Sequence, residues 1–423
     1  MEHIRASLFV LLTTKVVTNT MTNRILPNRT ANRPRRSPLS LGDGFSRRVG
    51  GRVSLGDGLS RRVGGRALIL VVLLLAAATA PAVGQEFGRI AYLEGSVTMY
   101  QQGEERFADI GAEVYPGDLL RTGGDGYLEL EIKPGPTTVK VAEDTALYVE
   151  RRDSHGRRET GFRLLRGNLD FVVKRLAGDE AVSVDAQSAS MGVRGTEFAV
   201  RTSPDDSVAV GVSDGSVEVT GEGATVRADS GVVVESIQQG ELSSQEVGSD
   251  EIDEYLEGWR ETRLQAFRSG AETFVTAYAR RYLDQRPRFI AAYRALSTYA
   301  DRLSSAVEDD ERRDRGGRFQ LRAEVSGAAV QVRSILPVFE NTFYRLAELG
   351  QFHEEGVGRT QIDEGLNSEQ FFSRYDTEKG RIEAQLAQAR YLLTLYRKIE
   401  EESMGGLPSG ESLFDSDSMR PNF

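Results

Sequence analysis

The feature of this sequence that most constrains its fold is a change in hydrophobic period near residue 250. Before that point, short runs alternate apolar and polar residues and are separated by Gly, Asp and Pro. After it, apolar residues recur every three or four positions over long stretches. Alternation is typical of strands and the longer spacing of amphipathic helices. The sequence therefore predicts an α+β chain with separate domains: an all-β sandwich or roll-like domain followed by an all-α helical bundle.

The predicted β domain spans residues 86–246. Its alternating runs are rich in β-branched residues, and no helical stretch intervenes between them, so parallel βαβ units are not expected. The runs that carry this prediction are residues 89–100, 126–132, 138–141, 168–173, 181–184, 198–200, 207–212 and 216–220.

The predicted helical domain spans residues 250–403. Four amphipathic segments are expected, at about 250–286, 288–308, 319–349 and 368–402, which suffice for a small bundle or two helical hairpins. Asp250 is the expected N-cap of the first. Pro287 should break or kink that segment, and Pro337 should bend the third. Residues 309–317 read as a loop, His353 falls in a predicted linker, and residues 404–423 are predicted to be disordered.

Residues 1–84 are predicted to be a leader. An apolar run, 67–83, follows Arg61, Arg62 and Arg66 and ends in small residues, which is typical of a secretory signal at about 61–84. The protein is therefore expected to be periplasmic or secreted, or anchored in the inner membrane if the run is retained. Residues 40–52 recur almost unchanged as 54–66. The duplicated stretch is interpreted either as a basic cytoplasmic tail or as sequence upstream of the true translation start.

The charge of the chain is divided unevenly. Residues 1–84 hold 13 of the 53 basic and 3 of the 63 acidic residues, which leaves 40 basic and 60 acidic residues in the rest of the chain. A strongly acidic mature protein argues against nucleic acid and anionic lipid as broad partners. Cysteine is absent, which excludes disulfides, thiolate catalysis and cysteine-ligated metals.

The order of the turn residues in the β region is more specific than its strands. The series begins with Gly95-Ser-Val97, which is followed by Gly117-Asp-Leu-Leu-Arg-Thr-Gly123. It continues with Leu164-Leu-Arg-Gly-Asn-Leu169, Val193-Arg-Gly-Thr-Glu-Phe198 and Val212-Ser-Asp-Gly-Ser-Val217. Over residues 88–235 this series resembles the FecR domain. The residues that carry the family motifs are Gly117, Asp118, Thr122, Gly123, Gly126, Gly167, Val193, Arg194, Gly195, Thr196, Glu197, Phe198 and Gly215. We expect them to shape turns rather than bind a ligand, with Arg194 and Glu197 paired or capping local backbone.

The resemblance implies a non-enzymatic domain used for recognition outside the cytoplasm, with a protein or glycan partner in the cell envelope and no cofactor or metal. The first hypothesis is a recognition or scaffold protein. The alternatives are a membrane-anchored FecR-type transducer that regulates a sigma factor, and a protein that binds cell-wall glycan. The helical region shows no family signature.

Two local patterns resemble functional motifs of other kinds. Gly211-Val-Ser-Asp-Gly215 fits the nucleophile motif G-x-S-x-G, but that motif needs a strand-to-helix turn and residues 216–220 read as another strand. The basic stretch 151–158 is interpreted as a hairpin tip rather than an anion site.

Overall fold

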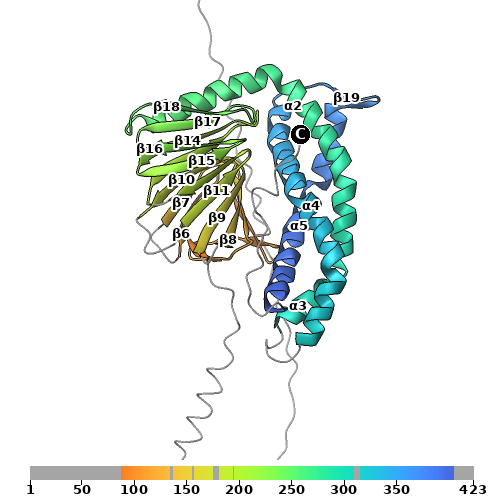
Figure 1. The fold of residues 1–423 in the computed structure, drawn as a ribbon. Coiled ribbons are helices and arrows are strands. Elements are labelled where there is room, and N and C mark those ends of the chain that lie inside the picture. Colours follow the sequence, from red (N-terminus) through yellow and green to blue (C-terminus); the bar gives the residue numbers. More distant parts are fainter. Residues whose placement is uncertain are drawn as a thin grey trace, which may run out of the picture. The chain divides into compact units, whose positions relative to one another are not determined.

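The computed structural model describes residues 87–403 apart from 134–136, 155–156, 175–180, 194 and 309–314. The predictions for the leader, Arg194, the tip of the basic stretch 151–158 and the tail therefore lie outside the described residues. Within the described residues, two nine-stranded sheets are followed by four helices, as the α+β prediction required. Figure 1 shows the sheets and the helices. Sheet A runs in the order β18 (Leu242–Glu246), β17 (Val232–Ser236), β14 (Val208–Asp214), β13 (Glu197–Thr202), β10 (Asn168–Val173), β7 (Thr137–Val141), β6 (Tyr127–Ile132), β1 (Gly88–Glu94) and β4 (Glu113–Val114). Sheet B runs β16 (Ala224–Asp229), β15 (Ser216–Gly221), β12 (Ala189–Val193), β11 (Ala181–Ala186), β9 (Arg157–Arg166), β8 (Ala146–Ser154), β5 (Leu119–Thr122), β2 (Val97–Gln101) and β3 (Glu104–Phe107).

The chain adds strands to the two sheets in turn and moves steadily from one side of the sandwich to the other. Neighbouring strands are antiparallel except β9 and β11, which are parallel because β10 between them belongs to sheet A. The alternating apolar residues of both sheets meet in one core, which includes Phe162, Phe171 and Phe198. This arrangement is the roll-like sandwich that alternation predicts.

One predicted strand is divided. Residues 89–100 were expected as a single run, but β1 ends at Glu94 in sheet A and β2 begins at Val97 in sheet B. Gly95 makes the turn with φ of 65°, and a Cβ there would lie 1.9 Å from the carbonyl oxygen of Asp125. The positive φ and this close approach require glycine, so the chain changes sheets at this position.

The helices are α2 (Ile252–Ser297), α3 (Ala300–Glu308), α4 (Arg315–Glu354) and α5 (Ser368–Ser403). The predicted start of a second helix at residue 288 is wrong, because α2 continues through Pro287. Proline removes one backbone hydrogen bond, but Gln285 and Phe289 on either side are buried, and their packing holds the helix together. Helix α4 likewise continues through Pro337.

Two terminal predictions also need correction. Helix α2 begins after Glu251 with no side-chain cap, so Asp250 is not its N-cap, although Asp253 and Glu254 occupy the first turn. His353 lies in the last turn of α4 rather than in a linker, and it is buried. The apolar spacing of α4 continues beyond residue 349 to Phe352, which packs against the bundle core. A small hairpin, β19 (Gln361–Asp363) and β20 (Leu366–Asn367), joins α4 to α5.

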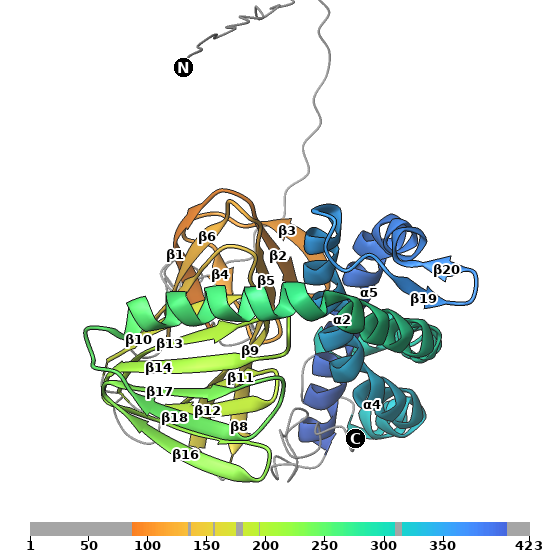
Figure 2. The same cartoon turned by 90° about the horizontal axis from the view of Figure 1, so that it is seen from above.

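Helix α2 contributes apolar side chains to two hydrophobic clusters, one on sheet A and one in the helical bundle. Its first turns cross the outer face of sheet A, and the rest runs beside α4 and α5 (Figures 1 and 2). Ile252, Leu256 and Trp259 pack on small residues of the sheet, Ala199 and Ala209 among them. From Phe267 onward its apolar residues join the bundle core. No helix within the described residues is long and apolar enough to cross a membrane.

A substitution at Gly211 tests the packing of α2 on sheet A. It lies on β14 under α2, where a Cβ would come within 2.6 Å of Ile252 Cγ2 and 3.1 Å of Leu256 Cδ1. We predict that Gly211→Val lowers the free energy of unfolding in urea by about 1–3 kcal/mol, because α2 must move away from the sheet. Gly192→Val is the matched control, since Gly192 is a strand glycine with no atom within 4 Å of its Cβ position. Equal stability of the two variants would contradict the packing described.

Candidate functional site

The first group of family-motif residues shapes the turn before β5. Gly117 has φ of 99°, and its neighbour Asp118 is buried. The Asp118 carboxylate accepts hydrogen bonds from the backbone N–H of Tyr115 at 2.8 Å and from Gln101 Nε2 at 3.0 Å. Burial raises the pKa of Asp118 to about 6, although these hydrogen bonds oppose the shift. Asp118 therefore bonds a backbone amide in its turn and remains poorly solvated.

The turn after β5 is equally crowded. Thr122 is buried, and its hydroxyl donates to the carbonyl oxygen of Ala142 at 2.6 Å. A Cβ on Gly126 would lie 2.4 Å from the Ser96 carbonyl oxygen, and one on Gly123 would lie 3.1 Å from Ser96 Cβ. These glycines are thus required by the close approach of neighbouring backbone.

Thr145, which the sequence analysis missed, connects this turn with the next motif. Its backbone N–H donates to Thr122 Oγ1 at 2.9 Å, while its own Oγ1 accepts from the N–H of Asn168 at 3.0 Å. Gly167, with φ of 100°, lies so close that a Cβ would be 2.2 Å from Thr145 Oγ1. No pattern in the sequence singles out Thr145, because the strand that follows it, β8, is not among the predicted runs.

The remaining motif residues form a second cluster. Gly195, with φ of 65°, and Gly215, with φ of 85°, lie side by side, and a Cβ on Gly215 would be 2.7 Å from the Gly195 carbonyl oxygen. Thr196 donates from Oγ1 to the Ser216 carbonyl oxygen at 3.0 Å. Val193 ends β12 and Glu197 begins β13, in which Phe198 stacks on Phe171 with ring centroids 4.6 Å apart. Gly211 and Gly215 lie on a strand and a strand-to-strand turn, which is not the geometry of a nucleophile elbow.

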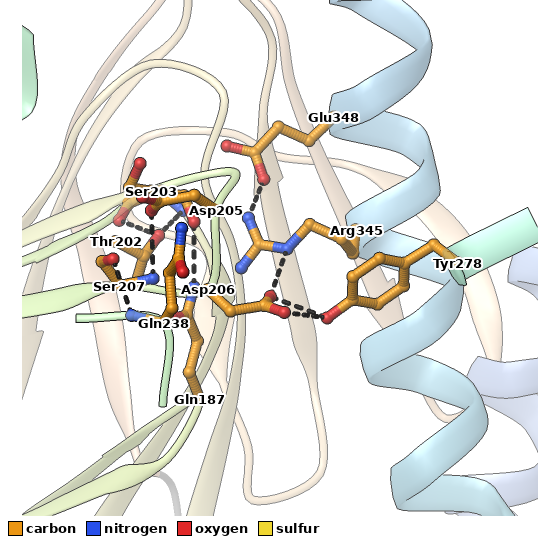
Figure 3. A network of polar contacts seen from close by, with 11 residues as sticks. Gln187, Thr202, Ser203, Asp205, Asp206, Ser207, Gln238, Tyr278, Arg345 and Glu348 are labelled. Atoms are coloured by element: carbon orange, nitrogen blue, oxygen red, sulfur yellow. Dashed lines mark hydrogen bonds and ion pairs between the residues drawn. The ribbon is translucent and has the colours of Figure 1, made fainter. Parts of the chain in front are cut away.

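Buried charged residues join the sandwich to the helices in the described structure. In the turn between β13 and β14, Asp206 accepts hydrogen bonds from the Tyr278 hydroxyl at 2.7 and 2.6 Å. Arg345 Nε lies 3.2 Å from the same carboxylate, and Arg345 also pairs with Glu348 on its own helix. Figure 3 shows Tyr278 and Arg345 both pointing from the helices toward Asp206. Burial, with the Asp206 charge, raises the pKa of Tyr278, so its phenol stays protonated as the donor.

The neighbouring Asp205 extends this contact. Its side chain is fully buried and lies 3.5 Å from Arg263 of α2. Asp205 also accepts from the backbone N–H of Ser207 at 3.2 Å, which shapes the turn. One short turn of sheet A thus presents two carboxylates to helices α2 and α4.

A second charged cluster lies on the outer face of sheet B. Arg390 of α5 is 2% exposed and donates to Glu340 of α4 at 2.6 and 2.5 Å and to Glu150 of β8 at 3.0 Å. Its guanidinium carbon lies 3.8 Å from the centroid of the Tyr148 ring. Arg390 therefore joins two helices and a strand by bidentate, stacked and ionic contacts, for which a lysine could not substitute.

Glu383 repeats this arrangement two turns earlier on α5. Its buried carboxylate accepts from Arg121 of β5 at 3.1 and 3.0 Å and from the Tyr100 hydroxyl at 3.5 Å. No group of three or more His, Asp or Glu side chains suited to a metal ion occurs in the described part of the chain. The charged residues instead pair with one another between the two domains.

Comparison with known proteins identifies the sandwich. A protein-family model described as FecR protein matches residues 118–218. The β-rich region contains a FecR domain. The match begins at Asp118, which lies in the first motif turn, and ends in β15. The helices lie outside it, and no curated protein matches the chain.

Among solved structures, two crystal structures of a candidate anti-sigma factor from Parabacteroides distasonis ATCC 8503 are similar. They are 19% and 20% identical, and the alignments cover 33% of this chain, each with a TM-score of 0.28. This chain spans 65% and 63% of those chains, slightly under two thirds of their length.

Replacing Arg390 tests the second cluster. We predict that Arg390→Met lowers the free energy of unfolding by about 3–5 kcal/mol, because it leaves the fully buried Glu340 carboxylate without its guanidinium. Adding Glu340→Met should restore most of the loss. The control Arg288→Met removes an exposed i,i+4 pair with Asp284 and should change stability by less than about 0.5 kcal/mol. An Arg390 variant as stable as this control, measured by urea unfolding, would refute the role assigned to the cluster.

Asp118 should make stability depend on pH. Its folded-state pKa of about 6 exceeds the ordinary value of 3.8, so the native protein binds this proton more tightly than the unfolded chain. Its contribution is therefore full below pH 4, is lost as the pH rises to about 6 and is constant above, with an amplitude of up to about 3 kcal/mol. Asp118→Asn should remove this component from urea unfolding curves recorded between pH 4 and 7.

Asp125 provides a control of opposite sign. It is exposed, and hydrogen bonds from Ser96 lower its pKa, so its contribution to stability is lost as the pH falls. Asp125→Asn should therefore leave the Asp118 component in place. The same pH profile for wild type and Asp118→Asn would contradict the assignment.

Proposed function

We propose that this chain is an exported, non-enzymatic protein of the cell envelope that uses its FecR domain to recognise another protein. The observation that carries the proposal is the FecR match over residues 118–218, within a sandwich whose motif residues form turns. The acidic composition beyond residue 84 also favours a protein partner over nucleic acid or anionic lipid.

In this proposal the helical domain is a fixed part of the recognition unit. The buried clusters around Asp206 and Arg390 each need one geometry to satisfy every charge, so they specify how helices and sandwich fit together. A domain on a flexible tether would not require buried charges at its contact. We therefore treat sandwich and bundle as one rigid binding body.

The second candidate is a FecR-type signal transducer that regulates a sigma factor. The family match favours it, because FecR proteins are regulators. This role needs the apolar run 67–83 to remain as a membrane anchor, with residues 1–66 in the cytoplasm as the segment that binds the sigma factor.

A glycan-binding role has weaker support. The exposed Tyr92 and the half-buried Tyr127 form an aromatic pair on sheet A, but their rings are inclined at 61° and so offer no flat platform. Both hydroxyls already bond to carboxylates, Tyr92 to Glu94 at 3.1 Å and Tyr127 to Glu129 at 2.7 Å.

N-terminal sequencing and fractionation of the protein from its native envelope separate the first two candidates. We expect a chain that begins near residue 85 and is released with the soluble fraction, because the apolar run ends in small residues typical of a cleavage site. A chain that keeps residues 67–83 and stays in the membrane would replace the first proposal with the transducer. Deleting residues 1–52 should not change the fractionation if that segment lies upstream of the true start.

A further inference from the structure

The edge of sheet B at β3 is unusual for a folded protein. All four residues of β3 are exposed, and β3 is the last strand of its sheet. Phe107 is 95% exposed, and Ile110, just beyond the strand, is 63% exposed. An exposed edge strand with an apolar anchor is the feature that natural sheets usually avoid unless another chain covers it.

The hairpin geometry shows which backbone groups of β3 face outward. Strands β2 and β3 are joined by Gln102 and Gly103 with φ of 55° and 78°, as in a type I′ turn. In such a hairpin the closing pair, Gln101 with Glu104, exchanges hydrogen bonds, and alternate pairs do so along the ladder. Glu104 and Arg106 therefore bond to β2. The N–H and C=O groups of Glu105 and Phe107 point away from the sheet and are available to another strand.

The other described edges are less open. On the opposite side of the sandwich the edge strands β16 and β18 contact each other, and neither carries a large exposed apolar side chain. Strand β4, the edge of sheet A nearest β3 in sequence, has only two residues. Strand β3 is thus the described edge that combines length, exposure and an apolar anchor.

A second copy of this chain is a poor partner for the open edge of β3. Antiparallel self-pairing must join outward-facing residues, which leaves three registers centred on Glu105, Arg106 or Phe107. The first places Glu105 opposite Glu105, the second Arg106 opposite Arg106, and the third Glu105 opposite Asp109. Like charges directly opposite each other are destabilising, so each register carries a repulsive pair.

We propose that β3 adds an extended strand of a partner protein, with a basic residue opposite Glu105 and an apolar residue packed on Phe107. Glu104, Glu105 and Asp109 make this edge acidic, with Arg106 the basic residue among them, and a basic strand complements it. Backbone hydrogen bonds supply affinity and alternate side chains supply specificity in this mode of recognition. The inference deepens the proposed function, on which it rests, by naming the surface and the chemistry of the partner.

A defined peptide tests the proposal. An eight-residue peptide that repeats Lys-Thr-Val-Thr carries lysine and valine two positions apart, as Glu105 and Phe107 are on β3. It should bind the purified protein at least about tenfold more tightly in fluorescence anisotropy than the same peptide with glutamate in place of lysine. Glu105→Pro removes one outward N–H and spares the bonds to β2, so it should weaken binding about tenfold. Glu105→Ala keeps that N–H and should lose only the preference between the peptides. Phe107→Ser, at a side chain that packs on almost nothing, should weaken binding without lowering the melting temperature.

Equal binding of the two peptides, or equal loss in the proline and alanine variants, would overturn the inference. So would a wild-type dimer that Glu105→Pro converts to monomer, because the occupant would then be a second copy. Photo-crosslinking in the native envelope separates this failure from that of the proposed function. Val330 is exposed on α4 and provides a second crosslinking position. Adducts with another protein from position 330 but none from position 107 would refute the assignment of β3 as the binding surface and leave the proposed function in place. The absence of adducts from both positions would refute the β3 surface and the proposed function together.

Discussion

The arrangement of the two domains depends on the buried guanidinium of Arg390. It is held by Glu340 of α4 and Glu150 of β8 and lies against the ring of Tyr148, so a single side chain orients α5 toward both another helix and a strand. Taking three charges out of water is costly, and such a cluster contributes less to stability than to uniqueness of geometry. A domain contact built in this way tolerates one arrangement. The contact of Glu383 with β5 and that of Asp206, in the turn between β13 and β14, impose the same requirement at two further places.

Apolar packing supplies the stability that the charges do not. The outer face of β13 and β14 carries Ala199, Ala209 and Gly211, whose small size lets Ile252 and Leu256 approach the sheet. Helix α2 then passes into the bundle core without interruption, since the buried neighbours of Pro287 hold it. One continuous helix thereby links the sandwich core to the bundle core. The two domains are distinct in secondary structure but share one helix.

Hydrophobic period was sufficient to predict the fold class, about half of the strands and most of the helical stripe residues, because these depend on which side of an element faces a core. It failed where a residue serves a contact between elements. Glu150 alternates with the apolar residues of its strand like a solvated charge. Arg390 falls on the apolar stripe of α5 between Leu386 and Leu393, but its spacing does not reveal its acidic partners. Gly211 resembles a turn or catalytic glycine, since nothing local reveals the helix above it. Proline rules predicted a break at Pro287 that tertiary packing overrides. The motif glycines were indicated by the order of the turn residues, although the backbone that crowds them comes from distant segments, as Ser96 does for Gly126. Thr145, which joins two of the turns, carries no such signal.

The fixed contact of the domains also bears on what β3 can recognise. The turn before β3 lies against α5, where a Cβ on Gly103 would come within 2.8 Å of the Gln388 backbone. A strand added to β3 would therefore run beside the bundle as well as the sheet. Because Arg390 and Glu383 set the position of α5 on sheet B, they also set the distance between that helix and the open edge. The buried charges would then affect recognition indirectly, because they fix the edge of β3 and the surface of α5 in one relative position for a single partner.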